Sequence, residues 1–429
     1  MNLPFTRVPA DFTNFMMPFR ERLSEPQYKK LETYTLGLIY SENKTVEGIC
    51  NARLTHTFSN SNYSHSLDFK CGEVDKLLEI YLTHLQHIPE IKTAGYTRLI
   101  VDDILLIKEG DKIKFVSSTF DHAEQHHVKG QKIVTFYLIT DKGHCFPVYF
   151  KFYNPKKCCK SAEEFKTKNQ LMQEGIEHLL KYKLKIREWT ADRWYSVLSN
   201  LVLIKRLCDD GKTIFYSVPV KSDFRIRDGN KWVEVKEFYG TLSDDMFKDT
   251  EVEVVSYNGE KKKRKFKTFR KTVRVKKIGR VKLLITKEIK EDGIIDEKPT
   301  YLVSNNLNWD AKKMLVVFLS RWQIEVFHRE GKVDLGFGDC QQRKEEGVTK
   351  HFFSALLANT FLRLMLYRSN YGEKYGVPLQ TVGEAIRYLK VDASRNVVKF
   401  LCGAVKRNWC LEAIYSVLRI STQREVVKS

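Results

Sequence analysis

The order of hydrophobic patterns along the chain constrains its fold more than any other sequence feature. From Arg98 to Tyr153 four strand-like runs follow one another, RLIVDDILLIK, KIKFVSS, KIVTFYLIT and CFPVYFKFY, each separated from the next by turn residues. A helical stretch over 161–181, the strand-like KLKIREWTAD, an amphipathic stretch over 194–207 and the strand-like TIFYSVPV come next. Strands followed by alternating strands and helices predict an α/β fold, in which helices cover a mixed sheet.

Segments of different character flank this region. The first 90 residues have helical periodicity, with helices predicted over 25–40 and 45–54, and both a helix-turn-helix and an ordinary helical bundle fit that pattern. Residues 221–298 are polar and rich in strand-like segments. A strand near 301–306, a long helix over 309–332 and a mostly helical remainder complete the prediction.

The charge balance indicates a polyanionic partner. Lysine and arginine number 73 against 53 acidic residues, giving a formal net charge of +20, while 42% hydrophobic residues suffice for a folded core. No apolar run approaches the length of a membrane helix, so we expect no membrane association. Nine cysteines without a C-x-x-C pair favour free thiols in a reducing cytoplasm.

The positive charge is densest between residues 261 and 282, where thirteen of 22 residues are lysine or arginine. Aromatic and β-branched residues alternate with them, so the tract can still form strands with one charged face. It fits a solvated edge hairpin, a nuclear address or a sheet that contacts phosphates, and we favour phosphate contact. The predicted DNA-binding residues of the tract are Lys261, Lys262, Lys263, Arg264, Lys265, Arg270, Lys271 and Arg274.

Acidic residues stand where strands and a helix meet. Asp102 and Asp103 interrupt the first strand-like run after RLIV, Asp192 follows KLKIREWTA, and Glu325 lies in the predicted helix after YLVSNN. Such carboxylates can converge above a sheet, where they bind hard cations such as magnesium or manganese. Two metal ions held in this way support phosphodiester cleavage. Taken alone, each aspartate also fits a turn residue or a helix cap.

The predicted helix over 309–332 places cations beside its acid. Arg321, Glu325 and Lys332 fall within roughly 60° of one another at about 100° per residue, and His328 lies on the same side. Glu325 therefore stands at the border of the buried face. An ordinary salt bridge between Arg321 and Glu325, four residues apart, explains the same spacing.

The string RWQIEVFHREGKVDLGFGDCQQRKEEGVTKHF resembles the C-terminal signature of bacterial insertion-sequence transposases with an RNase H-like DDE core. That signature is Tyr, two residues, Arg, three residues, Glu, six residues, Lys. In this chain it corresponds to Phe318, Arg321, Glu325 and Lys332 with both later spacings kept. Phenylalanine in place of tyrosine removes a hydroxyl group from the first position.

The same resemblance implies the other two acids and the domain order. Asp102 matches the first aspartate, with Asp103 as the alternative because a shift of one residue would reverse the side chain. Asp192, in the context ADRWY, matches the second. The implied regions are a helical DNA-end-binding region (1–92), the first part of the catalytic core (93–220), a basic β-rich insertion (221–298), the second part of the core (299–345) and a helical C-terminal region (346–429).

The resemblance implies an enzyme that binds terminal inverted repeats, cuts the 3′ strands with water and joins the 3′ hydroxyls to double-stranded target DNA. Asp102, Asp192 and Glu325 would hold two Mg²⁺ or Mn²⁺ ions. Relatives release the second strand through a hairpin intermediate, and they trap a flipped base with tryptophan. Because two transposon ends must be paired, the resemblance also implies a homodimer. The implied location is the bacterial cytoplasm, at the nucleoid. The implied DNA contacts are Phe318, Arg321, Lys332, His328, Arg329 and the candidate tryptophans Trp309, Trp322 and Trp232.

Two other functions remain open from the sequence. One is a domesticated DNA-binding protein without catalysis, against which the intact acidic triad argues. The other is a nuclease that cuts DNA without joining it.

Overall fold

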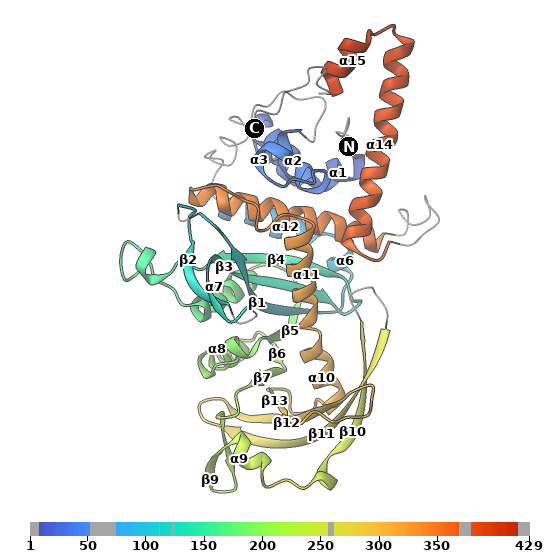
Figure 1. The fold of residues 1–429 in the computed structure, drawn as a ribbon. Helices are drawn as coiled ribbons and strands as arrows, with labels where there is room; N and C mark the ends of the chain where they lie inside the picture. The colour runs from blue at the N-terminus through green and yellow to red at the C-terminus, as the bar shows by residue number, and fades with distance from the viewer. Residues whose placement is uncertain are drawn as a thin grey trace. The chain divides into compact units, whose positions relative to one another are not determined.

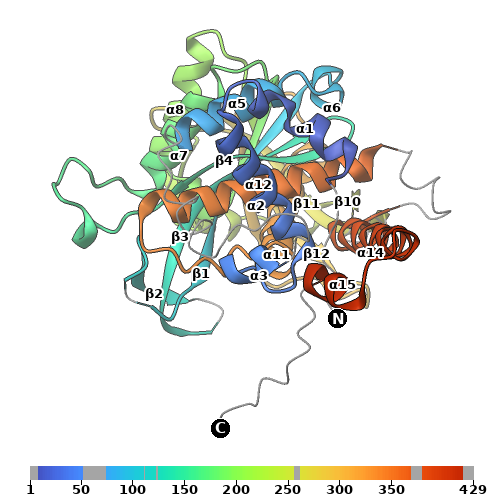
Figure 2. The ribbon, with the colours of Figure 1, turned by 90° about the horizontal axis from the view of Figure 1, so that it is seen from above.

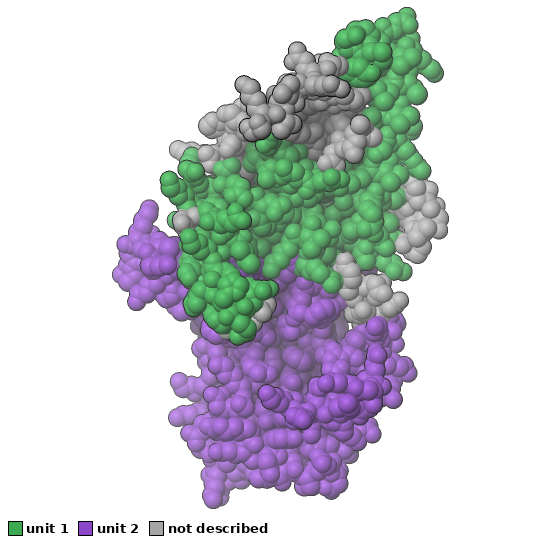
Figure 3. Space-filling model, in the orientation of Figure 1, with its two compact units in different colours: residues 1–84, 106–130, 329–429 green, residues 85–105, 131–328 purple. Residues whose placement is uncertain are grey.

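The computed structural model describes residues 8–51, 74–110, 112–121, 124–255, 261–368 and 379–418. The end of the helix predicted over 45–54 lies outside these residues. Contacts divide the chain into two units, both discontinuous in sequence (Figure 3). The first unit comprises residues 1–84, 106–130 and 329–429, and the second comprises residues 85–105 and 131–328.

The first sheet has the strand order β2-β3-β1-β5-β6, with β4 paired to β3 (Figure 1). Strands β3 and β4 are antiparallel, whereas β1, β5 and β6 are parallel. This mixed sheet confirms the predicted α/β, RNase H-like fold class. Its strands are β1 (Thr97–Ile107), β2 (Ser117–Asp121), β3 (His126–Thr140), β4 (Cys145–Phe152), β5 (Ile186–Ala191) and β6 (Phe215–Tyr216).

Helices cover both faces of this sheet. On one face α7 (Lys168–Leu179) packs against β3 so closely that a Cβ atom at Gly175 would overlap the ring of Phe136, and α8 (Leu198–Asp209) packs beside α7. On the other face lie α10 (Ala311–Leu319) and α11 (Trp322–Val333), drawn in orange in Figure 1. There the ring of Phe327 stacks on Tyr137, the next residue of β3, at 5.2 Å. Successive residues of one strand thus contact different helix layers.

A second sheet, β7-β13-β12-β11-β8-β9 with β10 paired to β11, forms the β-rich region. Ser217 separates β6 of the first sheet from β7 of the second, so the chain changes sheets at one residue. The strands are β7 (Val218–Val220), β8 (Arg225–Asp228), β9 (Lys231–Glu234), β10 (Lys248–Val255), β11 (Lys261–Val275), β12 (Gly279–Ile289) and β13 (Thr300–Ser304). Short helices α9 (Val235–Tyr239) and η3 (Asp244–Met246) lie between β9 and β10.

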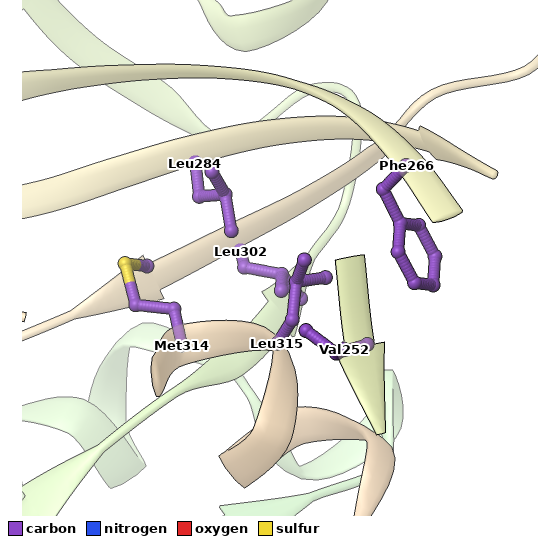
Figure 4. Close-up of a cluster of buried hydrophobic side chains, with 6 residues drawn as sticks. All are labelled: Val252, Phe266, Leu284, Leu302, Met314 and Leu315. Carbon is purple, nitrogen blue, oxygen red and sulfur yellow. The ribbon is translucent and has the colours of Figure 1, made fainter. Parts of the chain in front are cut away.

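Apolar side chains join the second sheet to α10. Leu284 and Leu302 are fully buried and face Met314 and Leu315 of the helix (Figure 4). Val252 and Phe266, from β10 and β11, complete the cluster, and Trp309 and Phe318 pack against it. Because α10 runs directly toward α11, this cluster fixes where the chain enters the helix that carries Glu325.

Helices form most of the first unit. Almost every side chain from Gly347 to Met365 in α12 is buried, so this helix is the centre of the unit. The hydroxyl of Tyr34 bonds the His351 Nδ1 at 2.8 Å, and α2 packs across α12 (Figure 2). The helices here are α1 (Ala10–Arg20), α2 (Glu25–Tyr40), α3 (Val46–Asn51), α5 (Val74–Leu85), α12 (Glu345–Tyr367), α14 (Val382–Lys406) and α15 (Leu411–Leu418). Short elements elsewhere are α6 (Pro89–Lys92), η1 (Lys156–Cys158) and η2 (Arg193–Tyr195).

Two local predictions were wrong. The long helix expected over 309–332 is two helices, because the chain breaks at Ser320 and Arg321 between α10 and α11. The side chain of Asp310 caps α10 by accepting a hydrogen bond from the Lys313 backbone N at 2.7 Å, which sets its start. The strand expected over 112–118 lies later, at 117–121, where it pairs with the start of β3. In both cases tertiary contacts decided a boundary that local periodicity left open.

The cluster on α10 makes a stability prediction. Replacing Leu302, which is fully buried, by alanine leaves a cavity and should lower the free energy of unfolding by about 2–5 kcal/mol. Replacing Ile294, which is 58% exposed, by alanine should change it by less than about 0.5 kcal/mol. Chemical denaturation of both variants measures the two values. Equal effects would contradict the assignment of this cluster as core.

Candidate active site

The two candidate aspartates stand at neighbouring strand positions. Strands β1 and β5 are parallel, and Val101 of β1 is beside Ala191 of β5. In both places the residue that follows is an aspartate. Asp102 continues within β1, and Asp192 comes directly after β5, where its side chain accepts a 3.5 Å hydrogen bond from the Trp194 backbone N. The sheet register therefore brings Asp102 and Asp192 side by side, as the sequence predicted from their strand positions.

A buried ion pair four residues earlier shows which face they share. Arg98 of β1 is opposite Glu188 of β5, and the Arg98 Nε donates to the Glu188 Oε2 at 2.9 Å. Lys313 of α10 also bonds Glu188. Since side chains alternate along a strand, residues 98, 100 and 102 face the same way. Asp102 and Asp192 thus point to the face that α10 covers.

Glu325 reaches the same face through Arg321. The Arg321 Nη1 lies 3.3 Å from the Asp102 Oδ2 and 2.6 Å from the Glu325 Oε1. The two carboxylate oxygens are therefore no farther apart than the sum of these distances. The local helix salt bridge expected between Arg321 and Glu325 does form. Because the same guanidinium also bonds a residue of β1, the contact is not only a local one.

A second link holds α11 against the sheet. The Thr135 hydroxyl of β3 donates to the Asp102 carbonyl oxygen at 3.1 Å and contacts the His328 Nε2 at 2.7 Å. With its proton given to the carbonyl, this hydroxyl accepts from the His328 Nε2–H. His328, predicted as a DNA contact, is thus bonded to the sheet beneath Asp102. Thr135 carried no signal in the sequence, because its role depends on the pairing of β3 with β1.

Burial and neighbouring charges raise the pKa of Asp102 to about 7. The largest cause is burial of the carboxyl group; Arg321 opposes it, and the charges of Asp103 and Asp192 add to it. An acid with such a pKa exchanges its proton near neutrality and gains strongly from a cation that replaces the proton. The site therefore favours a positively charged partner beside Asp102.

Asp103, the alternative first carboxylate, faces the opposite layer. Its Oδ1 accepts from the Lys168 Nζ at 2.7 Å and from the Tyr195 hydroxyl at 3.0 Å. Lys168 belongs to α7 and lies over the ring of Trp194, 4.6 Å from its centroid. Asp103 is thus part of a network on the α7 side, whereas Asp102 lies on the side of Arg321 and Glu325.

The donor set fits a divalent cation in chemical type. Carboxylates of Asp102, Asp192 and Glu325 are the hard oxygen ligands that magnesium and manganese prefer. Within the part of the chain that the structure describes, however, no three His, Cys, Asp or Glu side chains are close enough together to hold a metal. Arg321 lies between Asp102 and Glu325 and balances their charge.

An open pocket of about 370 Å³ lies beside Asp192. Phe318, the aromatic residue of the predicted signature, lines it together with Arg321 of the same signature. The pocket combines one carboxylate with two guanidinium groups, which suits a phosphate beside a metal-binding acid. Its lining residues are Asp192, Arg193, Pro219, Thr300, Phe318 and Arg321.

The candidate tryptophans differ in exposure. Trp322 is 48% exposed and Trp232 is 40% exposed, so neither belongs to the core. Trp309 is half-buried against the cluster on α10, and its carbonyl accepts a 2.9 Å hydrogen bond from the Arg270 Nη1. Of the three, Trp322 is nearest in sequence to Glu325 and has an accessible ring.

Arg329 and Lys332 continue α11 beyond Glu325, and both are exposed. Both residues belong to the first unit, whereas the acids belong to the second.

Acids of the same sheet neutralise part of the basic tract. Lysines of β11 alternate with carboxylates of β10: the Lys261 Nζ lies 3.0 Å from Glu253, and the Lys263 Nζ lies 3.0 Å from Glu251. Arg264 pairs with Glu288 of β12. Lys271 lies 2.8 Å from Asp228 of β8. Lys262, Lys265 and Arg274 are exposed on the same strand, and no acid among the described residues pairs with them.

Sequence reasoning missed Arg98 and Glu188. Each stands four residues before its aspartate, in RLIVD and EWTAD, so the matched spacing in two apolar runs was an available signal.

Asp102→Asn tests the electrostatics of the site. Above its usual value of 3.8 the unfolded carboxyl loses its proton, whereas the folded one keeps it up to about pH 7, so stability falls as pH rises through this window. Without divalent metal we expect the variant to melt a few degrees above the wild type at about pH 8, with the gap closing toward about pH 4.

Asp103→Asn is the matched control. It weakens the bonds to Lys168 and Tyr195, so its melting temperature should fall below that of the wild type. If Asp102→Asn also melts below the wild type at about pH 8, the account of a destabilising buried charge is wrong.

Residues 18–206 match a protein family described as DDE superfamily endonuclease. The matched region includes Asp102 and Asp192 and ends before Glu325. No curated protein is significantly similar to the chain. In the described ranges, no helix combines the length and apolar character needed to cross a membrane. The predicted resemblance is confirmed: over residues 18–206 the chain is similar to DDE-type transposases and endonucleases.

Proposed function

We propose that the protein is a DDE transposase, which cuts DNA at the ends of a mobile element and joins the 3′ ends to target DNA. One observation carries the proposal: Arg321 joins Glu325 to Asp102, and Asp102 is next to Asp192 in the register of β1 and β5. Three carboxylates from three separate elements thus face one side of an RNase H-like sheet. The family match over residues 18–206 supports the same reading.

Asp102, Asp192 and Glu325 are the proposed ligands of two Mg²⁺ or Mn²⁺ ions. Such ions would activate a water and stabilise the leaving oxygen of the scissile phosphodiester. The partly buried position of Asp102 raises the proton affinity of its carboxylate, which strengthens its preference for a cation. Thr135 and His328 hold the backbone of Asp102 and the helix of Glu325 together, so both acids keep their places.

Arg321 is the proposed phosphate-binding residue of the site. In the absence of metal its guanidinium balances Asp102 and Glu325. With those charges balanced by metal, the planar group is available for a bidentate contact to a phosphate. Phe318 forms the apolar wall of the adjoining pocket, where a deoxyribose would fit against the ring.

The remaining DNA contacts are proposals of the same kind. The exposed rings of Trp322 and Trp232 suit stacking on an unpaired base, whereas Trp309 is held by its packing against α10. Arg329 and Lys332 would bind phosphates farther along the DNA. Residues 1–92 would bind the inverted repeats, and two chains would pair two ends in the cytoplasm, with or without a hairpin step.

A nuclease that does not join DNA is the second candidate, because the matched family is described as an endonuclease. Both candidates share the same hydrolytic step, and they differ in whether a 3′ hydroxyl replaces water as the nucleophile. Incubating precut ends with a supercoiled plasmid separates them. Joined product supports the transposase, and its absence with intact cleavage supports the nuclease.

Glu325→Gln tests the proposed chemistry. The amide keeps the shape of the side chain but loses the charge that binds metal, so cleavage should fall by at least about 100-fold. The measurement is magnesium-dependent cleavage of a duplex that carries the DNA flanking the gene.

Glu291→Gln is the matched control, because Glu291 is exposed in the turn after β12. This substitution removes one negative charge from the same unit. It should cut at the wild-type rate. Full cleavage by Glu325→Gln would overturn the assignment of Glu325.

A further inference from the structure

Three arginines form a row across neighbouring strands of the second sheet. Arg274 of β11 is directly opposite Arg280 of β12 on one side and Arg227 of β8 on the other. Residues directly opposite in antiparallel strands project from the same face. The three guanidinium groups therefore gather on one face of the sheet.

Such a row is unfavourable for folding alone, because like charges directly opposite each other repel. Within the described residues no carboxylate forms an ion pair with Arg227, Arg274 or Arg280. Arg227 is held by the turn that follows it, where its Nε donates to the Gly229 carbonyl oxygen at 3.2 Å. Burial and the nearby Arg270 and Arg280 lower the pKa of Lys282, as expected where positive charge is concentrated.

The rest of the basic tract contrasts with this row. Lys261, Lys263 and Lys267 each have an acidic partner on β10. Arg264 pairs with Glu288 of β12. The first half of β11 thus carries four cations that are paired with acids, whereas the three arginines near its end have no acidic partner among the described residues.

The arginines surround an open pocket of about 470 Å³. Its wall includes Thr272, whose hydroxyl accepts from the Lys282 Nζ at 3.0 Å. Guanidinium groups around a hollow of this kind are the arrangement that proteins use to bind phosphate. The pocket residues are Arg227, Gly229, Thr272, Val273, Arg274 and Arg280.

The row lies on the same face of the sheet as the open pocket of about 370 Å³. Thr300 of that pocket is directly opposite Thr286 of β12, which is in turn directly opposite Thr268 of β11. Thr300 therefore projects from the same face as Thr268, Arg270 and Arg274. Arg274 lies six residues, roughly 20 Å, along the strands from the level of Thr300 and two strand spacings, roughly 10 Å, to the side, so the two residues are about 22 Å apart. Duplex DNA rises about 3.4 Å per base pair, so this span is about six base pairs.

We propose that Arg227, Arg274 and Arg280 bind a backbone phosphate of the duplex whose end lies at Asp102 and Asp192, about six base pairs from the cleaved bond. This inference rests on the proposed function, since it takes DNA as the substrate. The shared face favours DNA over an acidic protein, because a duplex whose end lies at the acids can continue along the face that carries the three arginines. Arg227 and Arg280 carried no individual signal in the sequence, because only strand register brings them beside Arg274.

The test is the salt dependence of DNA binding by the full chain. The probe is a fluorescein-labelled duplex of mixed sequence of about 30 base pairs, titrated by anisotropy over a sodium chloride series. For Arg274→Gln with Arg280→Gln, the slope of log affinity against log salt should decrease in magnitude by about 1 to 2. The melting temperature of this variant should equal or exceed that of the wild type, because a repulsive pair is removed.

Lys267→Gln with Lys290→Gln is the matched control, since it removes two charges from the same unit at positions that already have acidic partners and that are not predicted DNA contacts. It should leave the slope unchanged. Equal loss of slope in both double variants, or tighter binding of labelled polyglutamate than of duplex by the wild type, would overturn the phosphate site and leave the proposed function standing. A wild-type chain that binds no duplex would instead overturn the proposed function itself.

Ethylation interference locates the contact. Modification of a phosphate about six base pairs from the cleaved bond should weaken binding by the wild type and not by the arginine variant. Interference that is identical for both proteins would contradict the proposed position.

Discussion

Arg321 lies between two carboxylates that would otherwise repel each other in a half-buried site. It bonds Asp102, whose pKa burial has already raised to about 7, and Glu325, which another element carries. One guanidinium thus offsets part of the cost of bringing acids together and ties α11 to β1. The bond from His328 to Thr135 ties α11 to β3, and the same hydroxyl bonds the Asp102 carbonyl oxygen of β1. The position of Glu325 therefore depends on two polar contacts made by residues three or four positions away from it.

The second sheet contributes to this arrangement through packing. Leu284, Leu302, Met314 and Leu315 fix α10 on the sheet, and α10 leads into α11 after the break at Ser320. The β-rich region is thus both a basic surface and the platform from which the helix of Glu325 starts. Near the start of β11 several lysines pair with acids of β10, whereas the three arginines near its end have no acidic partner among the described residues and can bind an external anion.

Sequence predicted the parts that local patterns determine. Asp102 and Asp192 follow apolar runs of strand character, so their place in the sheet could be inferred, and the register of β1 and β5 brings them together. The break before α11 could not be predicted, because Arg321 fits a continuous helix until its contact with Asp102 is known. The pairing of Lys263 with Glu251 depends on the register of β10 and β11, which no local pattern reveals. The metal ligands, the domain limits and the DNA contacts remain predictions.

The central claim is that Asp102, Asp192 and Glu325 meet at one divalent-cation site. Iron-directed cleavage of the protein tests it directly: Fe²⁺ takes the place of Mg²⁺, and ascorbate with peroxide then cuts the polypeptide near the bound ion. The account predicts three sets of fragments, with ends near residues 102, 192 and 325, all suppressed by excess Mg²⁺. Cuts near only one of these residues, or only elsewhere in the chain, would contradict it.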